Sequence, residues 1–399
     1  MDNKNWKIMS RCDLKGKKIA VLVFPYATDN IYSVPPKLNY VIGESGYSSF
    51  FISGKIPENI SLHPNTTPID IGIRIHHLRD IRPLIFSAIA WFAKLVAIQV
   101  KMAYVIIRLR REIGIVTNYF GSYYQLPILV AKLLGKKYIY HVAGSDVEPA
   151  RNIYGGFGKF VIILLTQWNY FFADLITVGS MKYLKNDPLS IWKKKIRQWA
   201  QFFGNAGLFQ QIVPISQRDN TVGFLGRMTN DKSVLELVQG IIIFLEKHPD
   251  YHFLLIGVGE LAEQVDKIIS ESRWSSRITR LDWVKYEEVQ DYLNKMKLMA
   301  LPSKNEGVPN VIMEAFSCGT PVISTDVGGI TDMIIEGETG FLFKGITPEE
   351  IAEGLESATE EGVDLEKISQ NARAILVEKY SLETSVTKYK QIIDELGTY

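Results

Sequence analysis

The residues that could carry chemistry are concentrated in one stretch, Leu301–Gly319, which reads LPSKNEGVPNVIMEAFSCG. We expect a strand to end at Leu301 and a helix to begin at Pro309, because proline suits the first helical position. The start of such a helix offers backbone donors and a partial positive charge to a phosphate. Glu306 in the loop and Glu314 in the helix could accept hydrogen bonds from the vicinal hydroxyls of a ribose or sugar. On the pattern alone, two solvated surface glutamates remain the alternative.

A second group of residues suits a diphosphate. Gly226 follows a predicted strand, Arg227 comes next, and Lys232 lies five residues further on. Arginine can bind such a ligand as a bidentate fork and lysine as a point charge, although two ordinary surface cations would look the same. Gly257 and Gly259 also lie between a strand and a helix. This G-x-G is a weak signal, since a tight turn explains it equally well.

The N-terminal half contains one further candidate, the segment HVAGSD from His141 to Asp146, directly after a predicted strand. In parallel sheets, residues just beyond the carboxyl ends of strands contact ligands. Gly144 and Ser145 would let this loop close over a ligand, while a structural hydrogen-bonding role for His141 remains the alternative. The double glycine of Val327–Gly329 permits another close approach of backbone.

Short apolar runs that alternate with helical patterns must position these residues, and they predict an α/β fold with parallel sheets covered on both faces. One series of expected strands comprises Lys18–Phe24, Tyr47–Ile52, Ile113–Thr117, Lys137–His141 and Leu175–Val178. A second series comprises Thr221–Leu225, His252–Ile256, Leu298–Leu301 and Pro321–Ser324. A polar, Gly- and Pro-containing stretch at Asn205–Asp219 marks the expected boundary between the two series.

The composition of the 399 residues is that of a globular protein, and the two cysteines exclude a disulfide scaffold and a Cys-based zinc site. The net charge of +2 hides an asymmetry. Residues 1–210 carry 27 Lys and Arg against 12 Asp and Glu, whereas residues 211–399 carry 18 against 31. The basic half indicates an anionic partner, with drift of surface charge as the alternative. It lacks the aromatic-interleaved basic motifs of nucleic-acid binders, so no nucleic-acid partner is expected. The polar residues 1–18 do not resemble a secretory signal.

The most apolar segment, Arg82–Arg111, predicts a long helix. Ser87, Lys94, Lys101 and Arg108 are spaced by seven and fall on one stripe. The opposite, apolar face is formed by Ile85, Ile89, Phe92, Val96, Val100, Ala103 and Ile107. A core helix, a helix lying in a membrane surface and a membrane span all remain open, although mid-segment lysines disfavour the span.

Taken together, these elements resemble the retaining glycosyltransferases of family 4. That family's pattern E-G-x-P-x-x-x-x-E-A-x-x-x-G-x-P-V is matched at Glu306, Gly307, Pro309, Glu314, Ala315, Gly319, Pro321 and Val322. The resemblance implies an α/β GT-B architecture, in which two Rossmann-like doubly wound domains face each other across a cleft. Residues 1–205 would form the acceptor domain and 206–380 the donor domain, while 381–399 would be a C-terminal helix that returns to the N-terminal domain. The family's glycine-rich loop after the first strand is replaced here by Phe24–Asn30, which has no glycine.

The resemblance also implies roles for individual residues. The catalytic residues would be His141, Arg227, Lys232 and Glu306. The donor-binding residues would be Gly226, Gly257, Gly259, Val284, Gly307, Val308, Pro309, Asn310, Val311 and Glu314. The acceptor-side residues would be Tyr26, Asp29, Asn30, Ser145 and Asp146. Within these sets, Glu314 would hold the nucleotide ribose, and Arg227 with Lys232 would stabilise the departing diphosphate without a metal ion.

The expected activity is therefore sugar transfer with retention, from a nucleotide diphosphate sugar to a glycan or lipid-linked acceptor of the cell envelope. No cofactor is expected beyond this co-substrate. The expected location is the cytoplasm, at the inner face of the cell membrane, with an anionic membrane surface as a further partner. The alternatives are a GT-B-fold sugar-nucleotide epimerase, which would need no acceptor, and an inactive scaffold that binds nucleotide sugars.

Overall fold

A computed structural model gives the fold of the chain. It describes residues 16–23, 35–54, 56, 60–73, 84–119, 122–142, 147–182, 188–199 and 207–398. The chain divides into two compact units. Unit 1 contains residues 1–201 and 382–399, and unit 2 contains residues 202–381.

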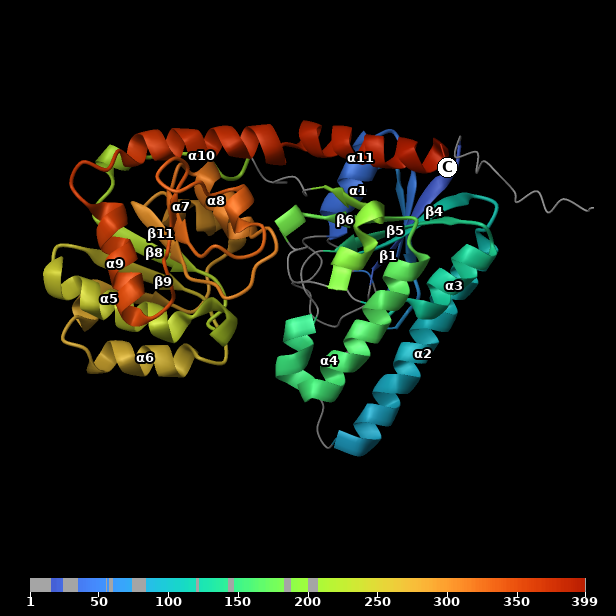
Figure 1. Ribbon diagram of the computed structural model, residues 1–399, viewed down its shortest axis with the longest axis horizontal. Coiled ribbons are helices and arrows are strands. Elements are labelled where there is room, and N and C mark those ends of the chain that lie inside the picture. Colours follow the sequence, from blue (N-terminus) through green and yellow to red (C-terminus); the bar gives the residue numbers. More distant parts are fainter. Residues whose placement is uncertain are drawn as a thin grey trace, which may run out of the picture. The chain divides into compact units, whose positions relative to one another are not determined.

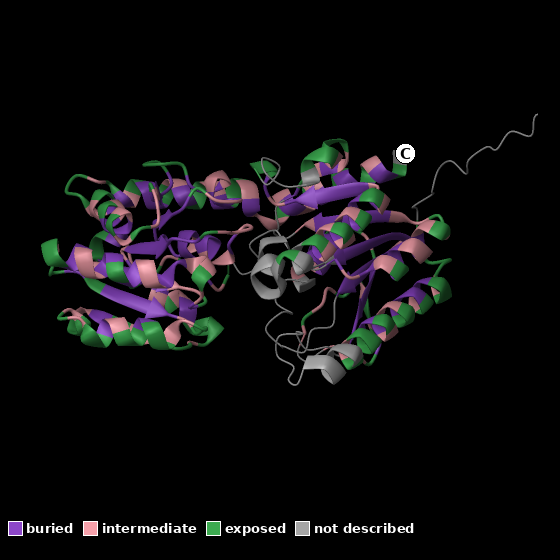
Figure 2. Ribbon diagram, turned by 60° about the horizontal axis from the view of Figure 1, so that its bottom comes forward, coloured by how far each residue is buried: buried purple, intermediate pink, exposed green. Residues whose placement is uncertain are grey.

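Unit 1 is built on a seven-stranded sheet in the order β3-β2-β1-β4-β5-β6-β7, in which every pairing is parallel. Its strands are β1 (Lys18–Val23), β2 (Ser49–Ser53), β3 (Thr66–Asp70), β4 (Ile113–Tyr119), β5 (Lys137–Val142), β6 (Leu175–Val178) and β7 (Ile196–Gln198). Its helices are α1 (Pro35–Glu44), α2 (Leu84–Arg108), α3 (Gln125–Leu133), α4 (Val147–Phe172), the 3-10 helix η4 (Pro188–Lys195) and α11 (Leu382–Thr398). The central strands are buried because helices cover them, as Figure 2 shows.

Unit 2 is a second parallel sheet, of six strands in the order β10-β9-β8-β11-β12-β13 (Figure 1). The strands are β8 (Thr221–Leu225), β9 (His252–Ile256), β10 (Ile278–Leu281), β11 (Leu298–Leu301), β12 (Val322–Ser324) and β13 (Phe341–Leu342). The α-helices are α5 (Val234–Lys247), α6 (Ala262–Glu271), α7 (Val289–Leu293), α8 (Asn310–Ser317), α9 (Pro348–Thr359) and α10 (Leu365–Tyr380). The 3-10 turns η5 (Ile215–Gln217), η6 (Asn230–Lys232), η7 (Ser275–Arg277), η8 (Tyr286–Glu288) and η9 (Ile330–Asp332) connect these elements.

The expected α/β class with two parallel sheets is confirmed. Four expected strands, β6, β8, β9 and β11, begin and end where the sequence predicts, and five others agree to within two residues where described. The strands that the sequence did not predict are β3, β7, β10 and β13. They lie at or near sheet edges, where exposure to solvent breaks the apolar run that reveals a central strand: β3, for example, is only partly buried.

The expected long helix exists as α2, and the sheet of unit 1 does not cover most of the apolar face identified from the sequence. The side chains that α2 buries in the core of unit 1 are Leu95, Ile98, Met102 and Ile106. In the apolar face identified from the sequence, Phe92, Val96, Val100 and Ile107 are exposed and Ala103 is buried, while the side chains of Ile85 and Ile89 lie outside the described ones. The helix is apolar on nearly every side, so its sequence pattern does not identify the face that the sheet covers.

Candidate functional site

The carboxyl ends of neighbouring parallel strands meet at one edge of the unit 2 sheet. Strands β9, β8, β11 and β12 are adjacent in that order. The loops that follow them begin at Gly257, Gly226, Pro302 and Thr325. In open parallel sheets this edge binds ligands, and it is where these loops bring the predicted donor-side residues together.

Two of the predicted catalytic side chains contact each other at this edge. Lys232, in the turn after β8, forms an ion pair and hydrogen bond with Glu306, in the loop after β11. Both side chains are largely buried, at 13% and 11% exposed. Ser303 also donates a hydrogen bond to the same Glu306 oxygen, at 2.8 Å. The sequence predicts Lys232 and Glu306 as site residues, but it does not predict that they pair, because they lie 74 residues apart in the chain. It also does not predict the role of Ser303.

The other predicted phosphate ligand, Arg227, points elsewhere in this structure. Its guanidinium contacts Asp231 at 3.0 Å, and its side chain is 67% exposed. Arg227 and Lys232 therefore belong to the same loop but have different carboxylate partners. The exposed arginine is free to change rotamer toward an anionic ligand at low cost, because exposed ion pairs contribute little stability.

The glycines Gly257 and Gly259 have the same structural cause. A Cβ at Gly257, whose φ is +152°, would lie 1.7 Å from the Gly226 carbonyl oxygen. A Cβ at Gly259 would lie 2.3 Å from the Met228 carbonyl oxygen. Backbone hydrogen bonds join the two loops, including Met228 N–H to the Val258 oxygen at 2.8 Å. Close packing of the loops after β8 and β9 therefore requires glycine at both positions, and a role of these glycines in donor binding stays a prediction.

Helix α8 begins one residue later than expected, since Pro309 occupies its N-cap with an extended backbone and Asn310 is the first helical residue. The loop before it is braced by the double-glycine loop, because Gly329 N–H donates to the Gly307 oxygen at 2.9 Å. A Cβ at Gly329 would lie 2.6 Å from that oxygen. Close backbone packing thus aligns the predicted donor-binding segment 307–311 with the helix start, whose partial positive charge suits an anion.

Glu314 lies in the second turn of α8, buried at 6% exposure. The Tyr286 hydroxyl donates to its Oε1 at 3.1 Å, and the Phe209 ring packs edge-on against Tyr286 with centroids 5.4 Å apart. These contacts hold the carboxylate in one position. Tyr286 and Phe209 were missed as site residues, and no local pattern could reveal them, because the contacts join distant parts of the chain.

Apolar side chains are exposed at the same edge. Val258 follows β9, and Trp283 and Tyr286 follow β10, the neighbouring strand. Trp283 is 69% exposed, and the predicted donor-binding residue Val284 is next to it in the chain and partly buried. Exposed indole and phenol rings beside a polar site suit an aromatic ligand such as a nucleobase.

In unit 1, His141 lies near the carboxyl end of β5 and is 4% exposed. Its Nδ1 contacts the Thr177 hydroxyl, and its ring packs against Trp199 and Tyr389 with centroids 5.2 Å and 5.9 Å away. Helix α11 supplies Tyr389. Burial lowers the pKa of His141 to about 3, so the imidazole is neutral in the folded protein. Its contact with a donor sugar stays a prediction.

This burial predicts an acid-dependent loss of stability. The pKa of His141 is about 3 when folded, below the ordinary value of 6.5, so between these values the unfolded chain binds more protons. The contribution to the free energy of unfolding is complete above 6.5 and falls as the pH decreases, by up to about 1.4 kcal/mol per unit. Urea midpoints at neutral and mildly acidic pH should therefore fall less for His141→Gln than for the wild type. His252→Gln, at an exposed histidine, should decline like the wild type, and an equal slope for His141→Gln would contradict the assignment.

The predicted acceptor-side residues cannot be placed. Tyr26, Asp29, Asn30, Ser145 and Asp146 lie outside the residues that the structure describes.

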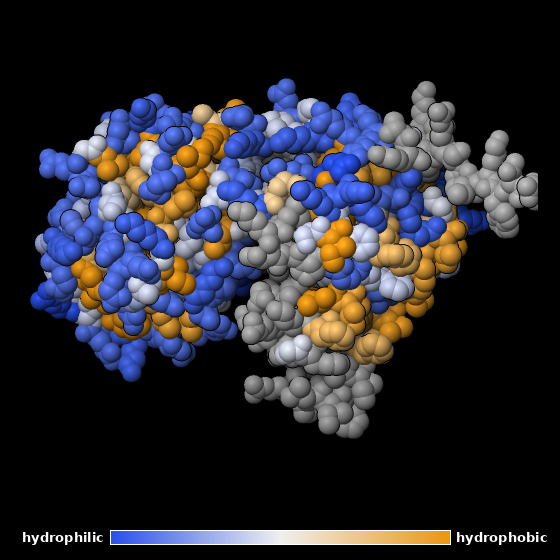
Figure 3. Space-filling view, in the orientation of Figure 1, coloured by the Kyte–Doolittle hydropathy of each residue, from blue (hydrophilic) through white to orange (hydrophobic). Residues whose placement is uncertain are grey.

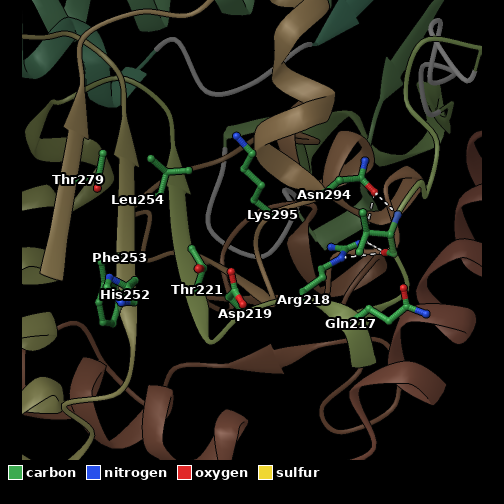
Figure 4. A pocket seen from close by; sticks show the side chains of 11 residues that line it. Gln217, Arg218, Asp219, Thr221, His252, Phe253, Leu254, Thr279, Asn294 and Lys295 are labelled. Carbon is green, nitrogen blue, oxygen red and sulfur yellow. Dashed lines mark hydrogen bonds between the residues drawn. The ribbon is translucent and has the colours of Figure 1, made fainter.

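A pocket of about 300 Å³ in unit 2 lies at the opposite, amino edge of the sheet, where Thr221 and His252 begin β8 and β9 (Figure 4). None of the predicted site residues lines it. Its wall includes Arg218, which is buried and donates to backbone oxygens around it. The pocket is therefore separate from the candidate site. The hydrogen bonds of Arg218 stabilise the fold of unit 2.

Comparisons with known proteins agree with this geometry. The sequence model of the family "Glycosyl transferases group 1" matches residues 208–375. One relative is CapM, the capsular polysaccharide biosynthesis glycosyltransferase of Staphylococcus aureus, which is 28% identical over 259 residues. The matched region covers 61% of this chain and 66% of CapM, so the chain spans slightly less than two thirds of the length of CapM.

Two solved structures have the same fold at low sequence identity. Sucrose-phosphate synthase from Thermosynechococcus elongatus superposes with a TM-score of 0.72 at 17% identity, covering 95% of this chain and 99% of that one. Anabaena HepE, solved in complex with UDP and glucose, gives a TM-score of 0.67 at 16% identity, covering 95% and 100%. Residues 208–375, which make up most of unit 2, match the glycosyl transferases of group 1, and the two parallel-sheet units have the GT-B fold.

Proposed function

We propose that this protein binds a nucleotide diphosphate sugar at the carboxyl edge of the unit 2 sheet and transfers the sugar to a glycan or lipid-linked acceptor. The observation that carries the proposal is the convergence of Lys232, Glu306 and Ser303 beside the start of α8, with the buried Glu314 in that helix. HepE, of like fold, binds UDP and glucose. CapM acts in capsular polysaccharide biosynthesis, which favours an envelope glycan as product.

The geometry suggests how each residue serves the reaction. The α8 start and Lys232 offer positive charge to the diphosphate, and Arg227 can join them by changing rotamer. Negative charge develops on the diphosphate as the sugar leaves, so cations fixed beside it stabilise the transition state more than the ground state. Glu314, held by Tyr286, is placed to accept hydrogen bonds from ribose hydroxyls.

Retention and metal independence are further parts of the proposal and rest on the resemblance to family 4. Among the described residues, no three His, Cys, Asp or Glu side chains are grouped as metal ligands. The anomeric coupling constant of the product, measured by ¹H NMR, tests retention, and turnover in the presence of a chelator tests metal independence. The two glutamates should not be interpreted as the carboxylate pair of a glycosidase, because Lys232 already pairs with Glu306 and Tyr286 with Glu314.

The named relatives and structures favour transfer over the epimerase alternative, since CapM is a glycosyltransferase and sucrose-phosphate synthase has the same fold. An inactive scaffold would bind the nucleotide sugar without consuming it. Release of the nucleoside diphosphate that depends on an acceptor supports transfer, while acceptor-free interconversion of the sugar supports epimerisation.

The first experiment is a thermal-shift screen with UDP, GDP and their common sugar conjugates. A ligand that binds only the folded state raises the melting temperature by mass action. We expect one base to stabilise the protein, and the conjugates of that base then enter the NDP-release assay. If no nucleotide or conjugate shifts the transition, the donor site is wrong. If the protein binds a nucleotide sugar but transfers the sugar to none of the acceptors tested, the result supports the inactive-scaffold alternative.

Replacement of Glu314 should weaken donor binding. In Glu314→Ala the ribose hydroxyls lose a charged acceptor, which costs about 1.5–3 kcal/mol, or roughly a 10- to 100-fold increase in the Kd for the nucleoside diphosphate. Isothermal titration calorimetry measures the change. Tyr286→Phe, which removes only the bond that positions the carboxylate, should have a smaller effect. Glu353→Ala, at an exposed glutamate of α9, is the matched control, and equal Kd values for it and Glu314→Ala would exclude the ribose role.

A cytoplasmic location at the inner face of the membrane is also proposed, since a lipid-linked acceptor would be presented there. The supporting observation is the basic composition of the N-terminal half. Cell fractionation of the full chain tests this placement.

A further inference from the structure

Helix α2 exposes a second apolar stripe after it has covered the core. Phe92, Val96, Val100, Tyr104 and Ile107 recur every three or four residues and are between 43% and 62% exposed. This spacing places them on one face of the helix. Within the described residues, Ala90–Arg108 is long and apolar enough to cross a membrane, and only 28% of it is buried. The stripe therefore needs a partner other than the sheet of unit 1.

Helix α4 repeats the arrangement. Among its described side chains, the large apolar ones that are exposed are Phe160, Leu164, Trp168 and Phe171, between 39% and 63% exposed and again spaced by three or four. The opposite side of the helix, at Ile162, Asn169 and Tyr170, is buried. These two long helices thus each cover the core with one stripe and expose another apolar stripe to water.

The two stripes belong to one side of unit 1. Helix α3 packs against both α2 and α4 and exposes Leu126 and Leu133. Figure 3, in the orientation of Figure 1, shows hydrophobic residues gathered over this region of the unit. Scattered exposed apolar residues are normal, but a contiguous patch of large side chains marks a contact surface. We call the exposed apolar residues of these three helices the α2–α4 surface.

The charges around this surface are mostly positive. Residues 84–111, 113–145, 149–173 and 188–199 contain no Asp or Glu. The exposed cations of α2 and the turn after it are Lys94, Lys101, Arg108, Arg110 and Arg111. In η4, Lys193 and Lys194 are exposed next to Ile191, which is 79% exposed. An apolar surface bordered by many cations and few acids is complementary to an anionic lipid surface.

A cavity of about 390 Å³ continues this basic fringe beside Phe171. Its lining cations are Lys132, Lys137, Lys194, Lys195 and Arg197. Two carboxylates, Asp174 and Glu395, lie among them and pair with Lys132 and Arg197 respectively. Lys194 and Phe171 connect the cavity to the exposed surface. The five cations outnumber the two acids, so the cavity keeps the sign of the surface around it.

We propose that the α2–α4 surface docks on an anionic phospholipid bilayer, with α2 and α4 lying in the plane of the interface. The exposed stripes would enter the headgroup and acyl boundary while Lys and Arg reach the phosphates. Helix α2 does not cross the bilayer, because Leu95, Ile98 and Met102 remain packed in the core of unit 1. The proposal extends the proposed function by naming the surface that would meet a lipid-linked acceptor, and it does not depend on the transfer reaction.

Vesicle flotation with the full chain tests this surface without any activity measurement. The probes are vesicles of phosphatidylcholine mixed with phosphatidylglycerol and vesicles of phosphatidylcholine alone. We expect the wild type to float with the anionic vesicles and to be released in part by salt, which screens the charges. Equal flotation with both vesicles, or none with either, would overturn the proposal. Failure of transfer with every donor would not affect this result.

Matched variants separate the surface from the rest of the chain. Leu164→Asp places a charge in the apolar stripe and should reduce the floated fraction about tenfold, because a buried carboxylate opposes insertion near anionic lipid. Val377→Asp, at a similarly exposed apolar position of α10, should float like the wild type. Lys193→Gln with Lys194→Gln should weaken flotation, whereas Lys390→Gln, at an exposed position of α11, should not.

The same variants report on another occupant of the surface. If the α2–α4 surface instead pairs two copies of this chain, sedimentation velocity will show a dimer that Leu164→Asp dissociates and vesicles do not bind. That result, or an effect of Val377→Asp equal to that of Leu164→Asp, contradicts the proposal. Circular dichroism and melting temperature establish that each variant is folded, since the substituted side chains are exposed.

Discussion

Replacing either member of the Lys232–Glu306 pair should reduce turnover by about 10²–10³-fold, the effect of removing one fixed electrostatic group from a transition state. The two variants should nevertheless differ in binding. Lys232→Met removes the cation that balances the charge of the Glu306 carboxylate, so repulsion between this carboxylate and the diphosphate should also raise the Kd for the nucleoside diphosphate. Glu306→Gln leaves Lys232 available and removes a negative charge, so nucleotide binding should be unchanged or tighter.

Turnover is measured as NDP release with saturating donor and acceptor, and affinity by calorimetry with the nucleoside diphosphate. Because the two side chains contact each other, the double variant should be less impaired than the product of the single effects. Lys247→Met, at an exposed lysine at the end of α5, is the charge-matched control. Strictly multiplicative effects, or turnover of Lys232→Met within about threefold of the control, would contradict a shared role at the reacting diphosphate.

Arg218→Met should cause the largest loss of stability. The guanidinium is 6% exposed and donates to the backbone oxygens of Val213, Leu293, Met296 and Cys318 and to the side chains of Asn294 and Thr320. Burial lowers its pKa to about 10, so it remains charged at neutral pH. Each buried carbonyl left without a donor costs about 1–3 kcal/mol, and we expect a total of about 3–5 kcal/mol.

This network bears on the site because Cys318 ends α8, the helix that carries Glu314. For a unit of this size the loss corresponds to a melting temperature lower by roughly 10 °C. Differential scanning calorimetry measures the shift. Arg373→Met, at an exposed arginine with one side-chain hydrogen bond to Gln211, should melt within a few degrees of the wild type. If Arg218→Met also melts within a few degrees of the wild type, the hydrogen bonds of Arg218 contribute far less to the free energy of unfolding than their number suggests.

The amino-acid sequence determined the class of fold and most of the central strands. Buried parallel strands are continuous apolar runs, so β8, β9 and β11 were predicted residue for residue. The stretch that contains Glu306 and Glu314 was recognised because its spacing lies within one loop and one helix. Edge strands such as β3 and β10 were missed, because their exposed residues break the apolar run.

Only the tertiary structure decided which residues meet. The ion pair of Lys232 with Glu306 and the support of Glu314 by Tyr286 join loops that follow different strands, and no local spacing encodes such contacts. The same holds for the packing that requires Gly257 and for the burial of His141 under α11. The exposed stripe of α2 is the clearest case. The sequence determined a helix that is apolar nearly all round, and the sheet of unit 1 decided which stripe it covers and which it leaves for another partner.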